Sequence, residues 1–438
     1  MAMKWLMREK FYFGSPKLTQ AAFVMVNTIK DEDLQELNQL SEQITNLIGT
    51  DDDVTLNKMK DFVQRYVFGS ETIPIPQDNM DFLTDKLREL HPQKIQSTHY
   101  TTPFCAECIT EDTAKSMTDG FVFFGEKFTL DSYLFDLMTA GSAEVEFVEK
   151  PNVHTALIVP DILEDSPLAN QLVHLRLQEK SQQKNIAGDM QVREDSNYTQ
   201  FSSYDRLKAW AKEKIIEVIQ DATITTNVYH KRLKMIGLLL QAPLENAPYR
   251  HFDPFYQLKN LVTYMGSYTE LKHDTLLYVK QAYAEMGGGG PGGCDIYVET
   301  PALPVPKGYI EAQPDFLDKL MTLNTETTPY FTGTYEQAKF IEFGKILEKL
   351  KEIGIKQMHN EVISDEDFER LRLLATSSLQ HIVIPTKTIG TPSQKEMRGA
   401  LIADIFTSEI DGPLYEAIGR PAIMLLMVND INGGRVVL

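Results

Sequence analysis

The sequence has few cysteines, no long apolar run and no excess of positive charge. Its longest apolar stretches, Ile236–Leu240 and Ala422–Val428, are far shorter than the roughly 18 residues that a transmembrane helix needs. Basic residues number 43 against 62 acidic ones, so the formal charge is −19. This balance argues against a nucleic-acid partner, because phosphates require clustered Lys and Arg. The 22 Phe and 18 Tyr instead indicate a folded protein, with a core that does not depend on disulfides.

The three cysteines leave several hypotheses open. Cys105 and Cys108 form a C-A-E-C motif, and Cys294 is the remaining thiol. The short spacing fits a local disulfide, part of a metal site, or no chemical role. A zinc site would need two further ligands. A redox motif would need a βαβ setting, whereas the flanking T-T-P-F predicts a loop.

Both ends of the sequence suggest a piece of a longer chain. Residues 1–8 lack the apolar segment of a secretory signal. The last residues, 434–438, read as the middle of a strand. A missing signal therefore says little about the compartment of the full protein.

Apolar periodicity predicts an α+β protein with a predominantly helical body and a small C-terminal sheet. We expect a helical body over residues 1–286 with short strands near 121–159, a Gly/Pro connector over 287–308, and helices followed by a small β-sheet over 309–438. The expected helices cover 17–90 with a turn at 49–53, then 131–140, 204–220, 226–241, 255–265, 268–286, 314–321, 334–353 and 364–378. The expected strands are 121–124, 145–148, 155–159, 295–299, 399–406, 422–428 and 435–438, and residues 181–202 read as a polar loop.

Particular residues predict where helices begin and end. An acid followed by proline, Asp253-Pro254, marks a start, and Gly266 allows a break. Gly354 suits the position just beyond a helix. Capping-box patterns begin at Thr334 and Ser364.

Two other motifs have a functional and a structural interpretation. Asp51–Asp53 resembles half of a calcium loop but lacks the Gly and the distal Glu, so an acidic helix start is the simpler interpretation. The glycine run at 287–293 resembles a phosphate loop. It follows an expected helix, however, and no Gly-Lys-Ser/Thr closes it, so it predicts a connector.

The stretch 266–281 carries the most informative pattern, G-S-Y-T-E-L-K-H-D-T-L-L-Y-V-K-Q. On a helix, Glu270, His273, Asp274 and Lys280 fall on one side, while an apolar set falls on the other. These four residues form the candidate polar cluster, and the first three are the candidate ligands of a divalent metal.

This stretch resembles the hallmark helix of a large bacterial and archaeal family, domain-of-unknown-function family 3160. The family helix reads G-S-W-T-E-L-R-H-D-T-I-L-Y-A-K-Q. The chain departs from it at Tyr268 and at Lys272, where Arg is usual, and exchanges one apolar residue for another at Leu276 and Val279. Five other stretches are similar to family segments: Met3–Leu6, Phe124–Phe128 with Asp131, Gly308–Glu311, and the C-terminal segments Ala403–Thr407 and Gly419–Pro421. The resemblance covers nearly the whole chain.

The resemblance implies a cellular location and a longer full-length chain, but it identifies no reaction. Family members commonly extend beyond both ends of this chain, and many carry an export or lipoprotein signal. We therefore expect an extracytoplasmic origin for this chain. The family has no established activity, so the resemblance identifies no catalytic residue.

Three interpretations of the polar helix side remain open. It is a solvated face, or a buried set of paired charges, or a catalytic or metal site. Glu270-x-x-His273 occurs in carboxylate-bridged metal bundles, but those need two such motifs and further Glu residues. No two of the nine histidines lie closer than eight residues, so an H-E-x-x-H zinc motif is absent, as is G-x-S-x-G.

The leading hypothesis is a non-enzymatic binding or scaffold module of a larger, exported protein, with a small-molecule, peptide or protein ligand. The alternative is a metal-dependent hydrolase that uses Glu270, His273 and Asp274. A third hypothesis is an acidic surface that binds cations or basic partners.

Overall fold

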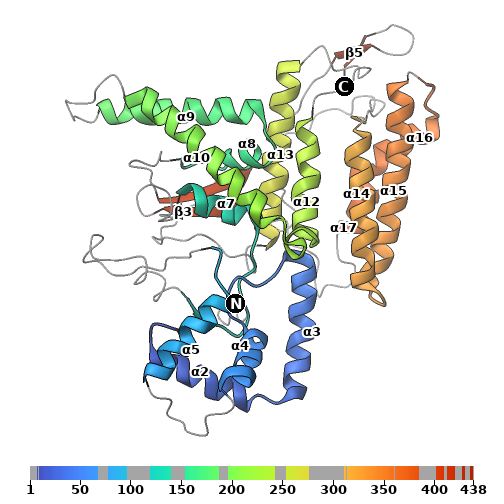
Figure 1. Cartoon of the computed structure of the whole chain (residues 1–438). Coiled ribbons are helices and arrows are strands. Elements are labelled where there is room, and N and C mark those ends of the chain that lie inside the picture. The colour runs from blue at the N-terminus through green and yellow to red at the C-terminus, as the bar shows by residue number, and fades with distance from the viewer. Residues whose placement is uncertain are drawn as a thin grey trace, which may run out of the picture. The chain divides into compact units, whose positions relative to one another are not determined.

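The computed structural model describes residues 7, 9–67, 77–95, 119–139, 153–186, 196–241, 253–275, 310–311, 313–359, 361–383, 401–408, 412–419, 427–429 and 435–437 of the chain. Helices dominate these residues, and the strands form two-stranded sheets, one of which, β3–β4, is the small C-terminal antiparallel sheet (Figure 1). The predicted fold class is therefore confirmed.

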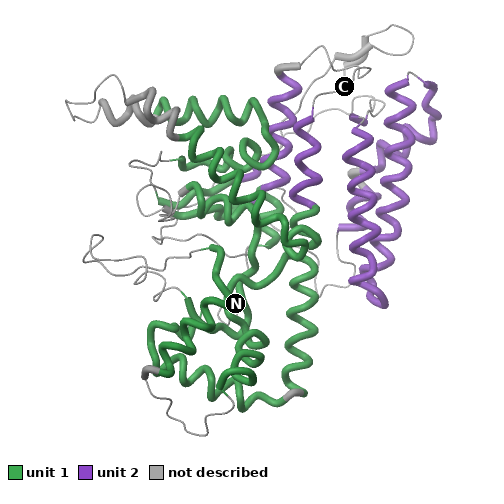
Figure 2. The backbone as a smooth tube through the Cα atoms, in the orientation of Figure 1, with its two compact units in different colours: residues 1–231, 269–286, 402–416 green, residues 232–268, 287–401, 417–438 purple. Residues whose placement is uncertain are grey.

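The chain divides into two compact units, each built from separate stretches of sequence (Figure 2). Unit 1 comprises residues 1–231, 269–286 and 402–416, and unit 2 comprises residues 232–268, 287–401 and 417–438. Two helices belong partly to each unit. They are α12 (Val228–Gly237) and α13 (Asp253–Thr275).

Unit 1 is mainly helical. Its elements are β1 (Phe11–Tyr12), α2 (Pro16–Thr28), α3 (Asp31–Ile48), α4 (Leu56–Phe62), a π-helical turn (Val63–Val67), α5 (Gln77–Leu90), β2 (Gly120–Phe121), α7 (Leu130–Thr139), α8 (Ile158–Leu163), α9 (Pro167–Ile186), α10 (Ser196–Val218), α11 (Ala222–Thr225), β3 (Leu401–Ser408) and most of β4 (Gly412–Ile418). β1 and β2 pair antiparallel, with Phe11 opposite Phe121.

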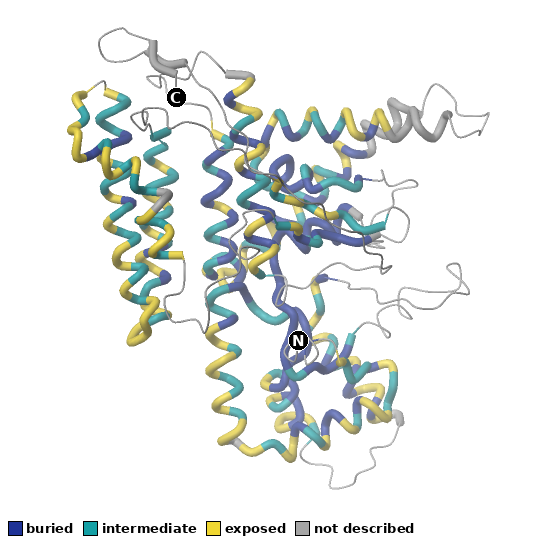
Figure 3. The backbone as a smooth tube through the Cα atoms, turned by 180° about the vertical axis from the view of Figure 1, so that it is seen from behind, coloured by how far each residue is buried: buried dark blue, intermediate teal, exposed yellow. Residues whose placement is uncertain are grey.

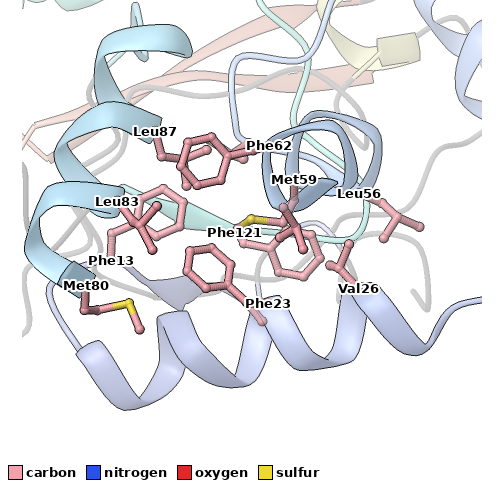
Figure 4. Packing of buried hydrophobic residues seen from close by; sticks show 13 residues of the cluster. Phe13, Phe23, Val26, Leu56, Met59, Phe62, Met80, Leu83, Leu87 and Phe121 are labelled. Atoms are coloured by element: carbon pink, nitrogen blue, oxygen red, sulfur yellow. The ribbon is translucent and has the colours of Figure 1, made fainter. Parts of the chain in front are cut away.

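A compact apolar core holds the N-terminal part of unit 1 together. Side chains from α2, α4 and α5 converge on β2 (Figure 4). The buried members are Phe13, Ala22, Phe23, Val26, Val54, Leu56, Met59, Phe62, Val63, Met80, Leu83, Leu87 and Phe121. Burial of each large apolar side chain contributes about 1.5–3 kcal/mol, so this cluster accounts for the packing of these helices.

A second packed region surrounds α7. The rings of Phe135 on α7 and Phe406 on β3 stack with centroids 5.9 Å apart, and His154 meets Phe406 edge-on at 6.1 Å. These contacts seat the β3–β4 sheet against α7. Helices α8, α9 and α10 pack on one another in the same unit.

Unit 2 is built around a helical hairpin. Its elements are the rest of α12 and α13, the 3-10 turn η3 (Leu238–Leu240), α14 (Pro314–Thr327), the 3-10 turn η5 (Thr328–Phe331), α15 (Tyr335–Met358), α16 (Asp365–Leu373), a π-helical turn (Leu374–Ser378), α17 (Leu379–Val383), β5 (Met427–Asn429) and β6 (Arg435–Val437). α14 packs along α15, and α17 also contacts α15 (Figure 1). The predicted cap of α16 is confirmed, because Ser364 Oγ accepts from the backbone N–H of Asp367 at 3.1 Å.

Buried and exposed residues alternate along the helices, as amphipathic packing requires (Figure 3). None of the helices in the described part of the chain is long and apolar enough to cross a membrane.

Four local predictions are wrong, each because tertiary packing outweighs a local signal. α13 runs unbroken through Gly266, and α15 continues past Gly354 to Met358. The strand expected at 155–159 is instead a turn followed by the start of helix α8, and most of the expected polar loop at 181–202 belongs to α9 and α10. Gly344 and Gly354 show that glycine inside a long, packed helix is tolerated at a cost of about 1 kcal/mol.

Several predictions fall outside the described residues. These concern Cys105, Cys108 and Cys294, the strands at 145–148 and 295–299, the glycine run and connector at 287–308, and the helix beyond Thr275, which would contain Lys280.

Candidate functional site

The end of α13 places three of the predicted site residues on its exposed side. Glu270, His273 and Asp274 are all exposed. His273 Nδ1 lies 3.7 Å from Asp274 Oδ1, and each of these side chains keeps about half of its surface open, 48% and 52%. The fourth residue of the predicted cluster, Lys280, lies outside the described residues.

Within the part of the chain that the structure describes, no three or more His, Cys, Asp or Glu side chains are grouped so that they could hold a metal ion. Glu270, His273 and Asp274 are included in that comparison. A metal in proteins is held by several ligands at about 2.0–2.6 Å, a geometry that these three exposed side chains do not assemble here.

The buried side of the same helix turn carries a cation. Lys272 keeps 2% of its side-chain surface, and its Nζ lies 2.8 Å from Asp131 Oδ2 on α7, which is fully buried. Lys272 also donates to Ser132 Oγ at 3.1 Å. Tyr229 of α12 donates to the other carboxylate oxygen at 2.9 Å, and Thr129 Oγ1 donates to Ser132 Oγ at 2.9 Å. We call Asp131, Tyr229 and Lys272 the first triad.

Ser132 and Lys272 are the residue types of a Ser–Lys nucleophile site, but their geometry is that of a fold-stabilising pair. A nucleophilic serine needs an adjacent base and access to substrate. Ser132 keeps 2% of its surface, and Lys272 is committed to a buried carboxylate. The arrangement therefore satisfies the buried charges and keeps Ser132 away from solvent.

A second triad repeats the same chemistry elsewhere in unit 1. Asp161 of α8 is fully buried, and its Oδ1 lies 2.5 Å from Lys208 Nζ. Tyr204 donates to Asp161 Oδ2, and Asn170 donates to the same oxygen at 3.4 Å. Burial and the neighbouring Asp161 carboxylate raise the pKa of Tyr204, so its hydroxyl stays a donor. Tyr204 and Lys208 both lie on α10, one turn apart.

The acidic run before α4 forms a third buried network. Asp52 accepts the backbone N–H groups of Lys94 and Ile95 at 2.9 and 3.0 Å. Asp53 accepts from Lys10 Nζ at 2.9 Å and from the N–H of Glu126 at 3.1 Å. Asp52 and Asp53 thus connect their loop to three distant segments, near residues 10, 94 and 126.

Asp51 completes this network. Lys127 Nζ lies 2.6 Å from Asp51 Oδ1. Burial raises the pKa of Asp51, and the Lys127 ammonium opposes that rise. Lys58 donates to the carbonyl oxygens of Asp51 and Asp53, each at 2.8 Å, and burial lowers its pKa. These acids hold lysines and backbone N–H groups, and they lie before the helix, which starts at Leu56 after the N-cap Thr55. Their interpretation as an acidic first turn is therefore wrong.

An apolar stripe is exposed on the part of α13 that belongs to unit 2. Phe255, Leu258 and Val262 keep 76%, 47% and 64% of their surface. Their spacing, i, i+3 and i+7, places them on one side of the helix. Tyr256 and Tyr264 lie on the other side and are buried. Sequence periodicity did not reveal this stripe, because both sides of this helix are rich in apolar residues.

The sequence identified the segments that contain Asp131 and Lys272 but gave no sign that the two residues form an ion pair. Asp131 and Lys272 both belong to stretches that carry the family resemblance, yet 141 positions separate them. Local spacing cannot show that two such residues meet. The only available signal was that the family usually has another cation, Arg, at position 272.

Comparison with known proteins gives one match. The model of the family described as "Protein of unknown function (DUF3160)" matches residues 1–438. Searches of curated proteins and of solved structures found no match.

Proposed function

The chain belongs to the DUF3160 family, and from that premise we propose that it is a non-enzymatic binding or scaffold module of a larger, exported protein. The single observation that carries the proposal is the exposed stripe of Phe255, Leu258 and Val262. Contiguous apolar surface on a folded protein marks an interaction site. The export and the larger size rest on the family resemblance alone.

The occupant we propose is an apolar groove on a partner protein. Helices recognised in this way present anchors at i, i+3 and i+7, which is the spacing of the stripe. The three side chains expose on the order of 300 Å², far less than the roughly 800 Å² that each partner contributes to a stable interface of standard size. A partner protein must therefore also contact surface around the stripe.

The buried charges support a binding role over a catalytic one. The ionisable groups of both triads and of the acidic run are engaged with partners inside unit 1. Removal of one partner from a buried ion pair costs about 3–5 kcal/mol, so these groups have a structural role that does not require a substrate.

The stripe can be tested with a photo-crosslinking amino acid at position 258 in the full-length protein, followed by reconstitution with the purified partner. We expect Val262→Ser to weaken the reconstituted complex about tenfold, since loss of two buried methyl groups costs on the order of 1–2 kcal/mol. The matched control is Val383→Ser on α17, where Val383 is 74% exposed and lies in the same unit.

Two results would overturn the proposal. Equal affinity for the Val262→Ser and Val383→Ser proteins would show that the stripe does not bind the partner. A dimer mass in light scattering that Val262→Ser abolishes would show that the stripe contacts a second copy of the chain.

A metal-dependent hydrolase remains the second candidate, because Glu270, His273 and Asp274 share the exposed side of one helix end. In that case a divalent metal would bind the three residues together with ligands from elsewhere. The two candidates differ in metal content, which provides the discriminating measurement given in the Discussion.

A further inference from the structure

The first triad differs from the second in where its partners come from. Asp131 accepts from Tyr229 on α12 and from Lys272 on α13, at 2.9 and 2.8 Å. Tyr229 is the second residue of α12, and Lys272 lies in the last turn of α13. One buried carboxylate therefore holds the ends of two different helices to α7.

Both helices continue from unit 1 into unit 2. The boundary falls after Lys231 in α12 and before Thr269 in α13. Each helix is continuous across that boundary. The residues that Asp131 holds are thus the unit 1 ends of two rigid elements whose other ends belong to unit 2.

We propose that Asp131 couples the unit 1 ends of α12 and α13, so that both helix ends detach from α7 and return to it together. We call this carboxylate the shared latch. Loss of either donor weakens the stabilisation of this buried carboxylate, which is costly. Opening of either helix end therefore weakens the hold on the other.

The second triad provides the matched comparison. Asp161 has the same burial and the same types of partner, a tyrosine and a lysine. Both partners lie on α10, which is wholly within unit 1. Loss of this carboxylate should loosen α8 and α10 but leave α12 and α13 unchanged.

The test is hydrogen–deuterium exchange of the full chain, read on peptides that cover α12 and the end of α13. Tyr229→Phe removes one donor and leaves the ion pair intact, so the protein should fold. A shared opening predicts that amides in both helix ends exchange faster by the same factor, about tenfold for a lost hydrogen bond to a charged group.

Helix ends that open independently would give a different pattern of hydrogen–deuterium exchange. Faster exchange in α12 alone would overturn the shared latch. Asp161→Asn is the control for general loss of stability. If it accelerates α12 and α13 as much as Tyr229→Phe does, the coupling is a property of the whole unit and the proposal fails.

Discussion

Lys272 and Asp131 form a buried ion pair, with Nζ and Oδ2 2.8 Å apart and side-chain exposures of 2% and 0%. Each residue lies in a stretch that carries the family resemblance. The pair therefore gives a structural reason for a cation at position 272, because a positive charge there balances the buried Asp131 carboxylate.

This pair predicts how unit 1 responds to substitution of Lys272. Lys272→Met leaves Asp131 buried without its cation, and we expect a loss of about 3–5 kcal/mol in the free energy of unfolding. Lys272→Arg, the residue usual in the family, keeps the charge and should lose far less. Urea denaturation followed by circular dichroism measures both. Equal losses for the two variants would show that shape, and not charge, matters at this position.

Two glycines should respond in opposite ways to alanine. A Cβ at Gly125 would lie 2.7 Å from Asp51 Cβ and 2.8 Å from Thr55 Cγ2, whereas Gly266 has open space around it. We expect Gly125→Ala to destabilise by about 1–3 kcal/mol through overpacking. Gly266→Ala, inside α13, should stabilise by about 0.5–1 kcal/mol through helix propensity. The change in melting temperature shows whether each variant is stabilised or destabilised. A destabilised Gly266→Ala protein would contradict the open space around Gly266.

Metal content separates the two candidate functions. If the chain is a binding module, elemental analysis of the purified wild-type protein and of His273→Ala should give the same, substoichiometric metal content. His381→Ala controls for loss of an exposed histidine, because His381 is 56% exposed and lies on α17. About one metal ion per chain, lost only in His273→Ala, would instead establish the metal site.

Glu352 on α15 predicts a loss of stability in acid. Hydrogen bonds from Lys349 and Lys356 lower the pKa of its carboxylate to about 2, from an ordinary value of 4.5. A lowered folded pKa means that this contribution is full above pH 4.5 and is lost as the pH falls towards 2. The effect is small, because the side chain is 47% exposed. Glu352→Gln should flatten this part of the stability–pH curve, and a curve identical to that of the wild type would contradict the assignment.

The sequence predicted the helical class and most helix positions, because apolar residues recur at helical spacing over long stretches. Capping chemistry located the start of α16 at Ser364. The errors arose where a local signal competes with packing, as at Gly266 and Gly354. The strand β4 was missed because Gly412 and Pro413 at its start read as a turn.

The candidate site could be predicted only in part. Helical periodicity correctly placed Glu270, His273 and Asp274 on one side of α13. It could not show that Lys272, between them in sequence, points to a buried partner on α7. Nor could it show that the units are made from discontinuous segments, because no shift in composition marks residues 231 or 268.

The acidic run at Asp51–Asp53 has a consequence for how the chain can vary in length. The three neighbouring carboxylates hold different partners: Lys127, the backbone N–H groups of residues 94 and 95, and Lys10 with the N–H of Glu126. A residue inserted or deleted within the run would therefore redirect at least two of the three carboxylates at once. Substitution of one of these acids removes the contacts of one carboxylate, whereas an insertion or deletion displaces several carboxylates from their partners. We therefore expect the spacing of these three residues to tolerate indels less than any neighbouring surface turn does.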